Sequence, residues 1–186
     1  MKKTLPVVLF AVLACTLQAV GQGAMQAKPG AEQKRIGYFA GTWKLVATTQ
    51  RTPLSSPGTL TITENNEWTS GGFHLMSRAT HQAPAGDLFG SQRSSTAIRS
   101  FDPTDRMYTY DAFISVGVIE HCRGTVAGDT WTFTCPGKVN GESFETRYTA
   151  KEISPTSYTF KVEILSGAGA GSTVMEGKAT KLSKGR

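Results

Sequence analysis

Apolar and polar residues alternate along most of this chain, with the two-residue period that is typical of β-strands. The alternation is most regular in residues 158–164, where every second side chain is apolar and those between are polar or charged. A period of two places one side of each strand in a core and the other in water. The pattern therefore predicts an all-β protein.

About ten short strands are expected, because turn residues interrupt the alternation at close intervals. The Asp102-Pro103 and Asn140-Gly141 pairs are two such turns. One helical segment is expected at 31–40, ended by Gly41, and a long polar connection at 81–93. The strands are predicted at 43–47, 58–68, 73–80, 94–101, 106–115, in a hairpin at 118–135, and at 144–150, 158–164 and 172–182.

The order of these elements predicts how they pair. No helical segment lies between the strands, so each strand is expected to pair with the next in an antiparallel meander. A meander of this many strands usually hides its two edges by closing into a barrel. An open two-sheet sandwich is the alternative architecture.

Two cysteines define the register of one hairpin. Counting outward from a two-residue turn at Gly128-Asp129 pairs Ala127 with Thr130 and, further out, Cys122 with Cys135. The cysteine pair falls on a non-hydrogen-bonded rung, where the Cα atoms are close enough for a disulfide. The spacing predicts a structural disulfide at this rung and an oxidising compartment.

The first thirty residues have the composition of an export leader. Met1-Lys2-Lys3 and the apolar run that follows indicate a signal peptide over 1–21, with a flexible leader over 22–30 and one barrel domain over 31–183. We expect an exported, periplasmic or secreted protein with no transmembrane segment. In the alternative, Cys15 ends a lipoprotein box and carries a lipid that anchors the protein to a membrane.

Charge gives little support to nucleic-acid binding. The formal net charge is +6, and the loss of Lys2 and Lys3 with the leader would lower it to +4. No cluster of Lys and Arg with interleaved aromatic residues is present in the sequence. This modest excess suits solubility.

Several segments together resemble a known family. The run from Gln33 to Trp43, with its Gly41-Thr42-Trp43 opening, resembles the calycin superfamily of lipocalins and fatty-acid-binding proteins. Trp68 with Gly71-Gly72-Phe73, then Phe101-Asp102-Pro103, then the cysteine hairpin extend the likeness to roughly residues 32–181. The whole resembles an uncharacterised family of exported bacterial lipocalin-like proteins, catalogued as a domain of unknown function.

The resemblance implies a calycin-like antiparallel barrel whose interior holds a small apolar or amphipathic molecule. It implies no catalytic residues. The fatty-acid-binding proteins insert a helical lid after the first strand, whereas residues 50–57 offer only a Pro/Ser turn. Lipocalins pack a late arginine over the motif tryptophan, and the last strand here offers Lys178 or Lys181 instead.

Five residues are candidates for contact with such a ligand. Trp43 is interpreted first as a core plug at one end of the barrel, with its indole N–H donating to a backbone carbonyl or lying near a lysine. Inward tyrosines and one inward acid would give polar points on an apolar wall. The candidates are Trp43, Tyr108, Tyr110, Glu120 and Tyr148.

Glu120 shares the inner face of its strand with Cys122. A buried carboxylate must be paired, protonated or wet. Glu120 therefore either meets water at an open barrel end or orients a ligand or a cation.

Metal and catalytic sites find no support in the sequence. The three histidines, His74, His81 and His121, are too scattered for a metal site, and His121 is expected on the outer face. A haem-binding barrel would need His74 or His81 inside. No Gly-x-Ser-x-Gly motif is present, and the serines cluster in loops, so no catalytic residue, cofactor or metal is assigned.

The leading interpretation is an exported, disulfide-stabilised barrel that binds a small hydrophobic or amphipathic ligand without catalysis. A packed barrel that serves as an envelope-associated interaction module is the first alternative, and it would have no cavity. A calycin-type enzyme is the second, and it would need paired polar groups that converge inside.

Overall fold

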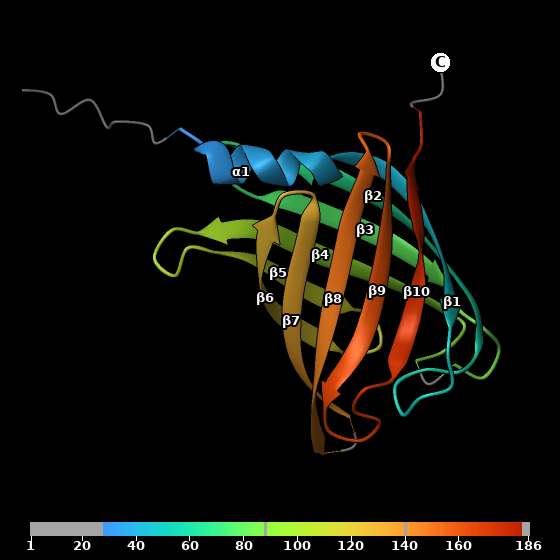
Figure 1. The fold of residues 1–186 in the computed structure, drawn as a ribbon. Helices are drawn as coiled ribbons and strands as arrows, with labels where there is room; N and C mark the ends of the chain where they lie inside the picture. Colours follow the sequence, from blue (N-terminus) through green and yellow to red (C-terminus); the bar gives the residue numbers. More distant parts are fainter. Residues whose placement is uncertain (1–27, 88, 140, 184–186) are drawn as a thin grey trace, which may run out of the picture.

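The computed structural model describes residues 28–183 apart from Leu88 and Asn140. Ten antiparallel strands form one closed barrel, and a short helix lies across one end (Figure 1). The helical elements are α1 (Ala31–Ile36) and the 3₁₀ turn η1 (Gly37–Phe39). The strands are β1 (Gly41–Thr49), β2 (Gly58–Trp68), β3 (Leu75–Gln82), β4 (Gln92–Asp102), β5 (Met107–Ile114), β6 (Ile119–Ala127), β7 (Thr130–Val139), β8 (Glu142–Ser154), β9 (Ser157–Ser166) and β10 (Thr173–Lys181).

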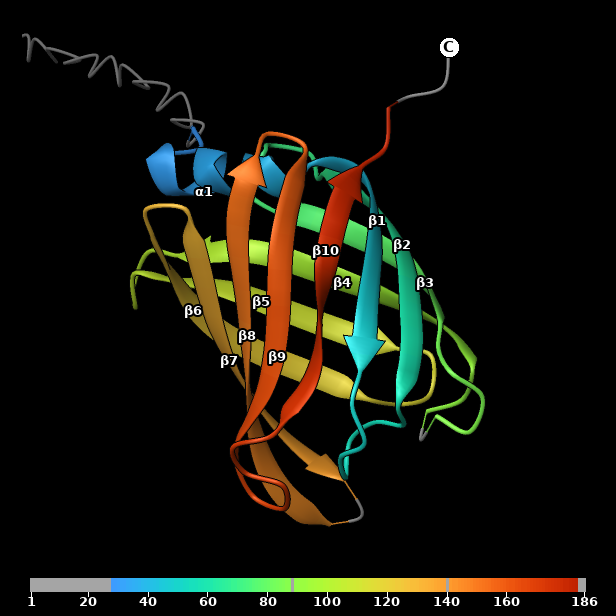
Figure 2. The same ribbon diagram turned by 45° about the vertical axis from the view of Figure 1, so that its right-hand side comes forward.

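Each strand pairs with its neighbour in sequence, and β1 pairs with β10 to close the sheet (Figure 2). In that last pairing Trp43 lies opposite Lys181. A closed sheet has no free edge, so every strand finds two hydrogen-bonding partners. The predicted all-β meander barrel with one short N-terminal helix is confirmed, and the two-sheet sandwich is wrong.

The cysteine hairpin has the predicted register. Ala127 pairs with Thr130 and Arg123 with Thr134, which places Cys122 beside Cys135. The two cysteines form a disulfide with their Cα atoms 4.2 Å apart. The apolar side of the hairpin faces the core, and Trp131 and Cys122 are almost fully buried.

The end of the barrel below α1 is filled by aromatic rings. Phe39 packs edge-on against Trp131 and Tyr158, with ring centroids 5.0 and 5.6 Å apart, and Trp43 lies 5.1 Å from Tyr158. Arg35 connects the helix to the barrel. It donates a hydrogen bond to the Gly128 carbonyl and forms an ion pair with Glu152 at 2.6 Å. We call Phe39, Trp43, Trp131 and Tyr158 the aromatic plug.

Two predicted boundaries differ from the structure. The connection expected at 81–93 is shorter, because His81 pairs with Arg93 and Gln82 with Gln92 in the ladder between β3 and β4. The strand expected from Phe73 begins at Leu75, because Gly71 and Gly72 both have positive φ and carry the turn further. His81 therefore belongs to a strand, which decides where its side chain points.

The segment after β1 contains no helix. Residues 50–57 form a turn with one isolated bridge between Thr52 and Ser55, in agreement with the sequence. The predicted signal peptide, Cys15 and most of the predicted leader lie outside the described residues. Within residues 28–183, no helix is long and apolar enough to cross a membrane.

Candidate ligand-binding cavity

The barrel is filled at the helix end and hollow at the other. A cavity of about 480 Å³ extends from beneath the aromatic plug to the loops at the end opposite α1. This volume lies in the range of small-molecule sites in proteins. Its wall is mostly apolar, with residues such as Leu45, Leu60, Ile62, Phe160 and Val162.

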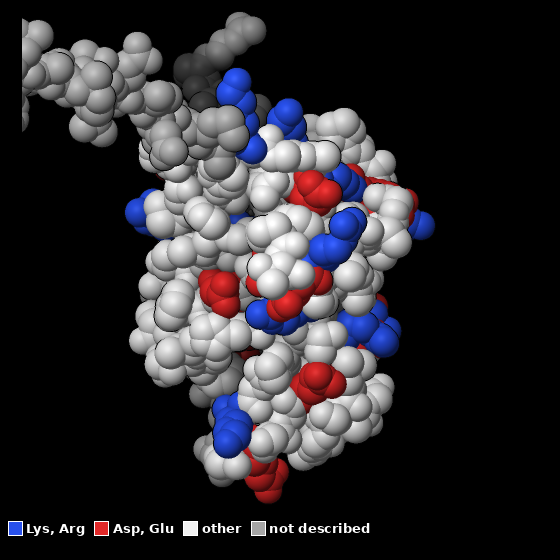
Figure 3. All heavy atoms as spheres, turned by 90° about the vertical axis from the view of Figure 1, so that its left-hand side faces the viewer, with Lys and Arg blue, Asp and Glu red and all other residues white. Residues whose placement is uncertain are grey.

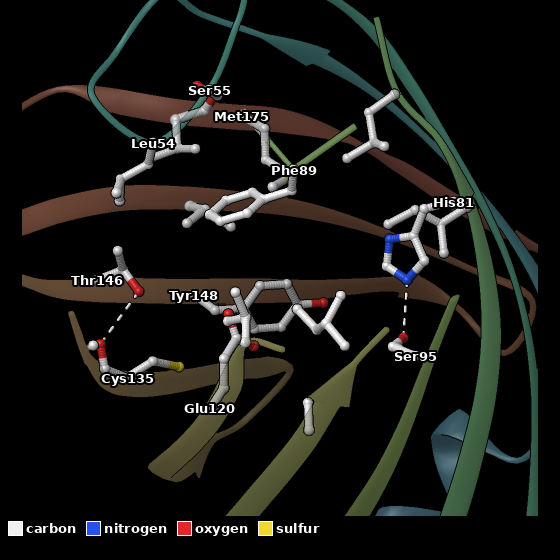
Figure 4. A pocket seen from close by; sticks show the side chains of 18 of the residues that line it. Leu54, Ser55, His81, Phe89, Ser95, Glu120, Cys135, Thr146, Tyr148 and Met175 are labelled. Atoms are coloured by element: carbon white, nitrogen blue, oxygen red, sulfur yellow. Dashed lines mark hydrogen bonds between the residues drawn. The ribbon is translucent and has the colours of Figure 1, made fainter. Parts of the chain in front are cut away.

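Figure 4 shows side chains from different elements that enter this one space. Glu120 comes from β6, Tyr148 from β8 and His81 from β3, while Phe89 reaches over from the loop between β3 and β4. Alternation in each strand turns these side chains inward. The polar groups among them come from separate strands.

Arg99 of β4 is a charged residue on the cavity wall whose guanidinium is surrounded by protein groups. Its Nη2 lies 3.6 Å from Glu64 Oε1, and its Nη1 donates to Asn66 Oδ1 at 3.3 Å. Asn66 Nδ2 also lies 2.9 Å from Glu64 Oε1. The guanidinium stacks over the rings of Phe39 and Tyr110 at 5.1 and 4.9 Å. We call Arg99, Glu64 and Asn66 the Arg99 cluster.

The Arg99 cluster carries no net charge. Burial lowers the pKa of Arg99, but the Glu64 carboxylate and the neighbouring tyrosine hydroxyls together more than offset this and hold the pKa above its ordinary value. Asn66 Nδ2 also donates to the Phe39 carbonyl, which accepts the Trp43 indole N–H as well, at 2.9 and 2.8 Å. The cluster thus ties the cavity floor to the 3₁₀ turn.

Three tyrosines line the deep half of the cavity. Burial raises the pKa of Tyr110, Tyr148 and Tyr158, so all three phenols are neutral at physiological pH. Tyr148 and Tyr158 lie near enough to affect each other's pKa. The geometry between their hydroxyls falls short of a hydrogen bond, and among the described residues the buried Tyr158 hydroxyl has no partner.

Glu120 lies on the inner face of β6, opposite Ala112 of β5. Its side chain is closely surrounded by protein and retains some exposure because one side faces the cavity. Burial raises the pKa of Glu120 above its ordinary value. No hydrogen bond or ion pair joins it to another residue of the part of the chain that the structure describes.

A second buried ion pair lies at the mouth of the cavity. Arg93 pairs with Asp87 at 2.7 Å, and both side chains are largely buried. Asp87 also accepts the backbone N–H of Phe89 at 3.1 Å, while the Arg93 guanidinium lies 5.8 Å from the Phe89 ring. This ion pair therefore holds the loop in the position that turns Phe89 into the cavity.

His81 faces the cavity and is neutral. Its Nε2 lies 2.9 Å from Ser95 Oγ, and burial and the nearby Arg93 lower its pKa to about 4. His74 and His121 lie elsewhere, exposed, where they contact Ser100 and Asp111. Among the described residues, no three His, Cys, Asp or Glu side chains gather where they could hold a metal.

The five candidate residues divide into two groups. Tyr110, Glu120 and Tyr148 line the cavity together. Trp43 and Tyr108 are buried but are not part of its wall: Trp43 belongs to the aromatic plug, and Tyr108 packs between Phe101 and Trp131 with centroids 5.1 and 4.8 Å apart. Lys181 lies over the Trp43 ring at 5.3 Å, one of the two lysines expected there.

Sequence reasoning missed Arg99 and Glu64. Arg99 lies on the same face of its strand as Ala97 and Phe101, and Glu64 on the same face as Leu60 and Ile62. The period of two therefore places both charged side chains inside the barrel. The signal was present in the pattern. Each charge alone suggests an outward residue, and only the pair explains why both are buried.

The surface carries charges of both signs. On the face shown in Figure 3, acidic and basic side chains are interspersed. Ion pairs of partly exposed side chains, such as Arg123 with Asp105 and Lys161 with Glu163, occur on the surface of the barrel. This face has the character of an ordinary solvated surface.

Comparison with known proteins agrees with the fold and assigns no activity. Rv2717c from M. tuberculosis is similar in structure, with a TM-score of 0.57, 12% identity, and coverage of 83% of this chain and 99% of that one. A redesigned β-barrel matches with a TM-score of 0.42 and 11% identity, over 79% of this chain and 94% of its own. No curated protein matches.

The model of a protein family described as "Protein of unknown function (DUF1579)" matches residues 28–181, which include all ten strands. The chain belongs to the DUF1579 family, and it is folded as a closed ten-stranded antiparallel barrel.

Proposed function

We propose that this protein is an exported, non-catalytic barrel that binds one small amphipathic molecule in its cavity. The observation that carries the proposal is the cavity of about 480 Å³, with apolar walls and a few polar groups from separate strands. Such a combination is the usual composition of a ligand pocket. Trp43 and Tyr108 would act through packing, and Tyr110, Glu120 and Tyr148 through contact.

Export is supported by the leader composition and by the disulfide between Cys122 and Cys135. Disulfides persist in oxidising compartments and are rare in a reducing cytosol. A barrel packed throughout, as the interaction-module alternative requires, would leave no such cavity.

Binding is tested with a neutral, environment-sensitive dye such as Nile red. We expect saturable binding to the wild-type protein at one site, measured by fluorescence titration. Ala112 is buried on the cavity wall, so Ala112→Phe fills the space and should abolish binding. Ala79→Phe does the same from β3, should one of the two variants fail to fold.

Thr109→Phe is the matched control, because Thr109 lies on the opposite face of the same strand as Ala112. It should bind the dye as the wild type does. The proposal is wrong if the folded wild-type protein binds no dye, or if both cavity-filling variants fold and still bind it with unchanged affinity.

A further inference from the structure

The cavity holds one acid whose charge nothing offsets. Of the described charged residues on its wall, Arg99 is neutralised by Glu64 and Arg93 by Asp87. Lys138 stands at the rim, where it is exposed to solvent. His81 is neutral. The remaining group, Glu120, leaves an interior with an excess of one negative charge when it is ionised.

The surroundings of Glu120 leave space for a ligand group. Its neighbour across the ladder is Ala112, one of the smallest residues on the wall, so the carboxyl meets no side chain there. Tyr110, two positions before Ala112 on β5, also faces inward. It lies close enough to Glu120 that the carboxylate charge raises the pKa of Tyr110. In Figure 4 the Glu120 side chain points into the cavity toward Tyr148.

Aromatic rings beside a carboxylate favour a cation. The faces of tyrosine and phenylalanine rings attract ammonium groups, and a desolvated carboxylate forms its strongest hydrogen bonds with charged donors. Phe133, Phe160 and Tyr148 supply such rings on the same wall. Arg99 is a weak attractor for an anion by comparison, because Glu64 already neutralises it and two of its guanidinium nitrogens already face Glu64 and Asn66.

We propose that Glu120 selects ligands that carry a basic amine on an apolar body, and that it binds the ammonium group with its carboxylate while the body fills the apolar cavity. This inference rests on the proposed function, since it names the chemical class of the molecule in the same cavity.

The test compares three molecules with one tail and different head groups: nonylamine, nonanol and nonanoate. Isothermal titration is carried out on the full mature chain at about pH 8, where nonylamine is cationic and nonanoate is anionic. We expect the amine to bind about tenfold or more tightly than the alcohol, and the acid to bind most weakly, since a charged hydrogen bond contributes roughly that factor.

Glu120→Gln keeps the shape of the side chain and removes its charge. We expect this variant to bind amine and alcohol with similar affinity, while its affinity for the alcohol stays near that of the wild type. Glu176→Gln is the matched control, because Glu176 is exposed on the outer face of β10. It should keep the full preference for the amine.

The outcomes separate the two proposals. If the folded wild type binds no Nile red, the proposed function itself fails. If it binds Nile red and the amine is not preferred over both other head groups, or if Glu120→Gln retains the preference, only the assignment of an amine ligand is overturned.

Discussion

The interior of this barrel is not entirely apolar, because it contains buried charged residues. Arg99 and Glu64 lie beneath the aromatic plug, where each is compensated by the other and by Asn66. A buried ion pair gives little net stability compared with apolar residues, but removal of one partner leaves an uncompensated charge. Replacement of either Arg99 or Glu64 alone should therefore destabilise the fold.

Arg99→Met should lower the free energy of unfolding by about 3 kcal/mol, because Glu64 then lies buried without its cation. The double variant Arg99→Met/Glu64→Leu should recover most of that loss. Urea denaturation followed by circular dichroism measures both. Arg78→Met, at an exposed position on β3, is the control and should change little. Equal losses in the single and double variants would contradict this account.

His81 should make stability depend on pH. Its pKa is about 4 in the folded protein and about 6.5 in the unfolded chain, so the unfolded state binds more protons between these values. The contribution of neutral His81 is complete above about pH 6.5 and is lost as the pH falls to about 4. The size of this loss is on the order of 2 to 3 kcal/mol.

His81→Gln should remove this part of the pH dependence, as measured by denaturation at several pH values between the two pKa values. Gln can still bond to Ser95. His74→Gln, at an exposed site, serves as the control and should follow the wild-type curve. A His81→Gln curve parallel to that of the wild type would show that His81 does not carry the effect.

Glu120 could be found from the sequence and Arg99 was not, although both follow the same rule of alternation. Glu120 drew attention because Cys122 fixes the inner face of its strand. In β4 the inward residues are Ala97, Arg99 and Phe101, and the outward ones include Ile98. The apolar outward residue blurs the pattern, and the partner Glu64 lies 35 positions away in the sequence.

At the scale of elements, hairpins are the unit that the sequence describes best. The turn at Gly128-Asp129 and the cysteine spacing fix β6 against β7 residue by residue. The boundaries of β3 and β4 were harder to predict, because 81–93 is polar throughout most of its length while the ladder continues to Gln82 and Gln92. Hydrogen bonds between backbones extend strands where side chains give no signal.

The disulfide should stabilise the β6–β7 hairpin. It closes a loop with a sequence separation of 13, for which the chain-entropy model gives about 3 kcal/mol. Cys122→Ala/Cys135→Ala should lower the free energy of unfolding by about 2 to 3 kcal/mol. The measurement is guanidinium denaturation with and without a reductant, which should destabilise the wild type alone. A reductant effect of equal size in both proteins would point to a cause other than this bond.

At the scale of the whole molecule, the two ends of the barrel differ in how they are filled. Rings and ion pairs occupy the α1 end, while the loops 50–57 and 83–91 surround the open cavity at the other. Local opening is easiest where few buried contacts must be broken. The strands should therefore be more stable at the α1 end than near the cavity mouth.

Hydrogen exchange followed by mass spectrometry should show this difference. We expect the slowest exchange in segments of β1, β9 and β10 next to Trp43 and Tyr158, and the fastest in the two mouth loops. A ligand in the cavity should slow exchange at the mouth more than at the plug, since the plug is already closely packed without it. Uniform exchange along each strand would contradict a barrel with two unequal halves.

The pairing of β1 with β10 has a consequence for how the molecule is made. These strands are joined by seven residue pairs yet come from opposite ends of the barrel domain, so the sheet cannot close until both β1 and β10 are available to pair. Until then two unsatisfied edges remain open to other chains. Aggregation through these two edges should therefore be easiest before β1 and β10 have paired.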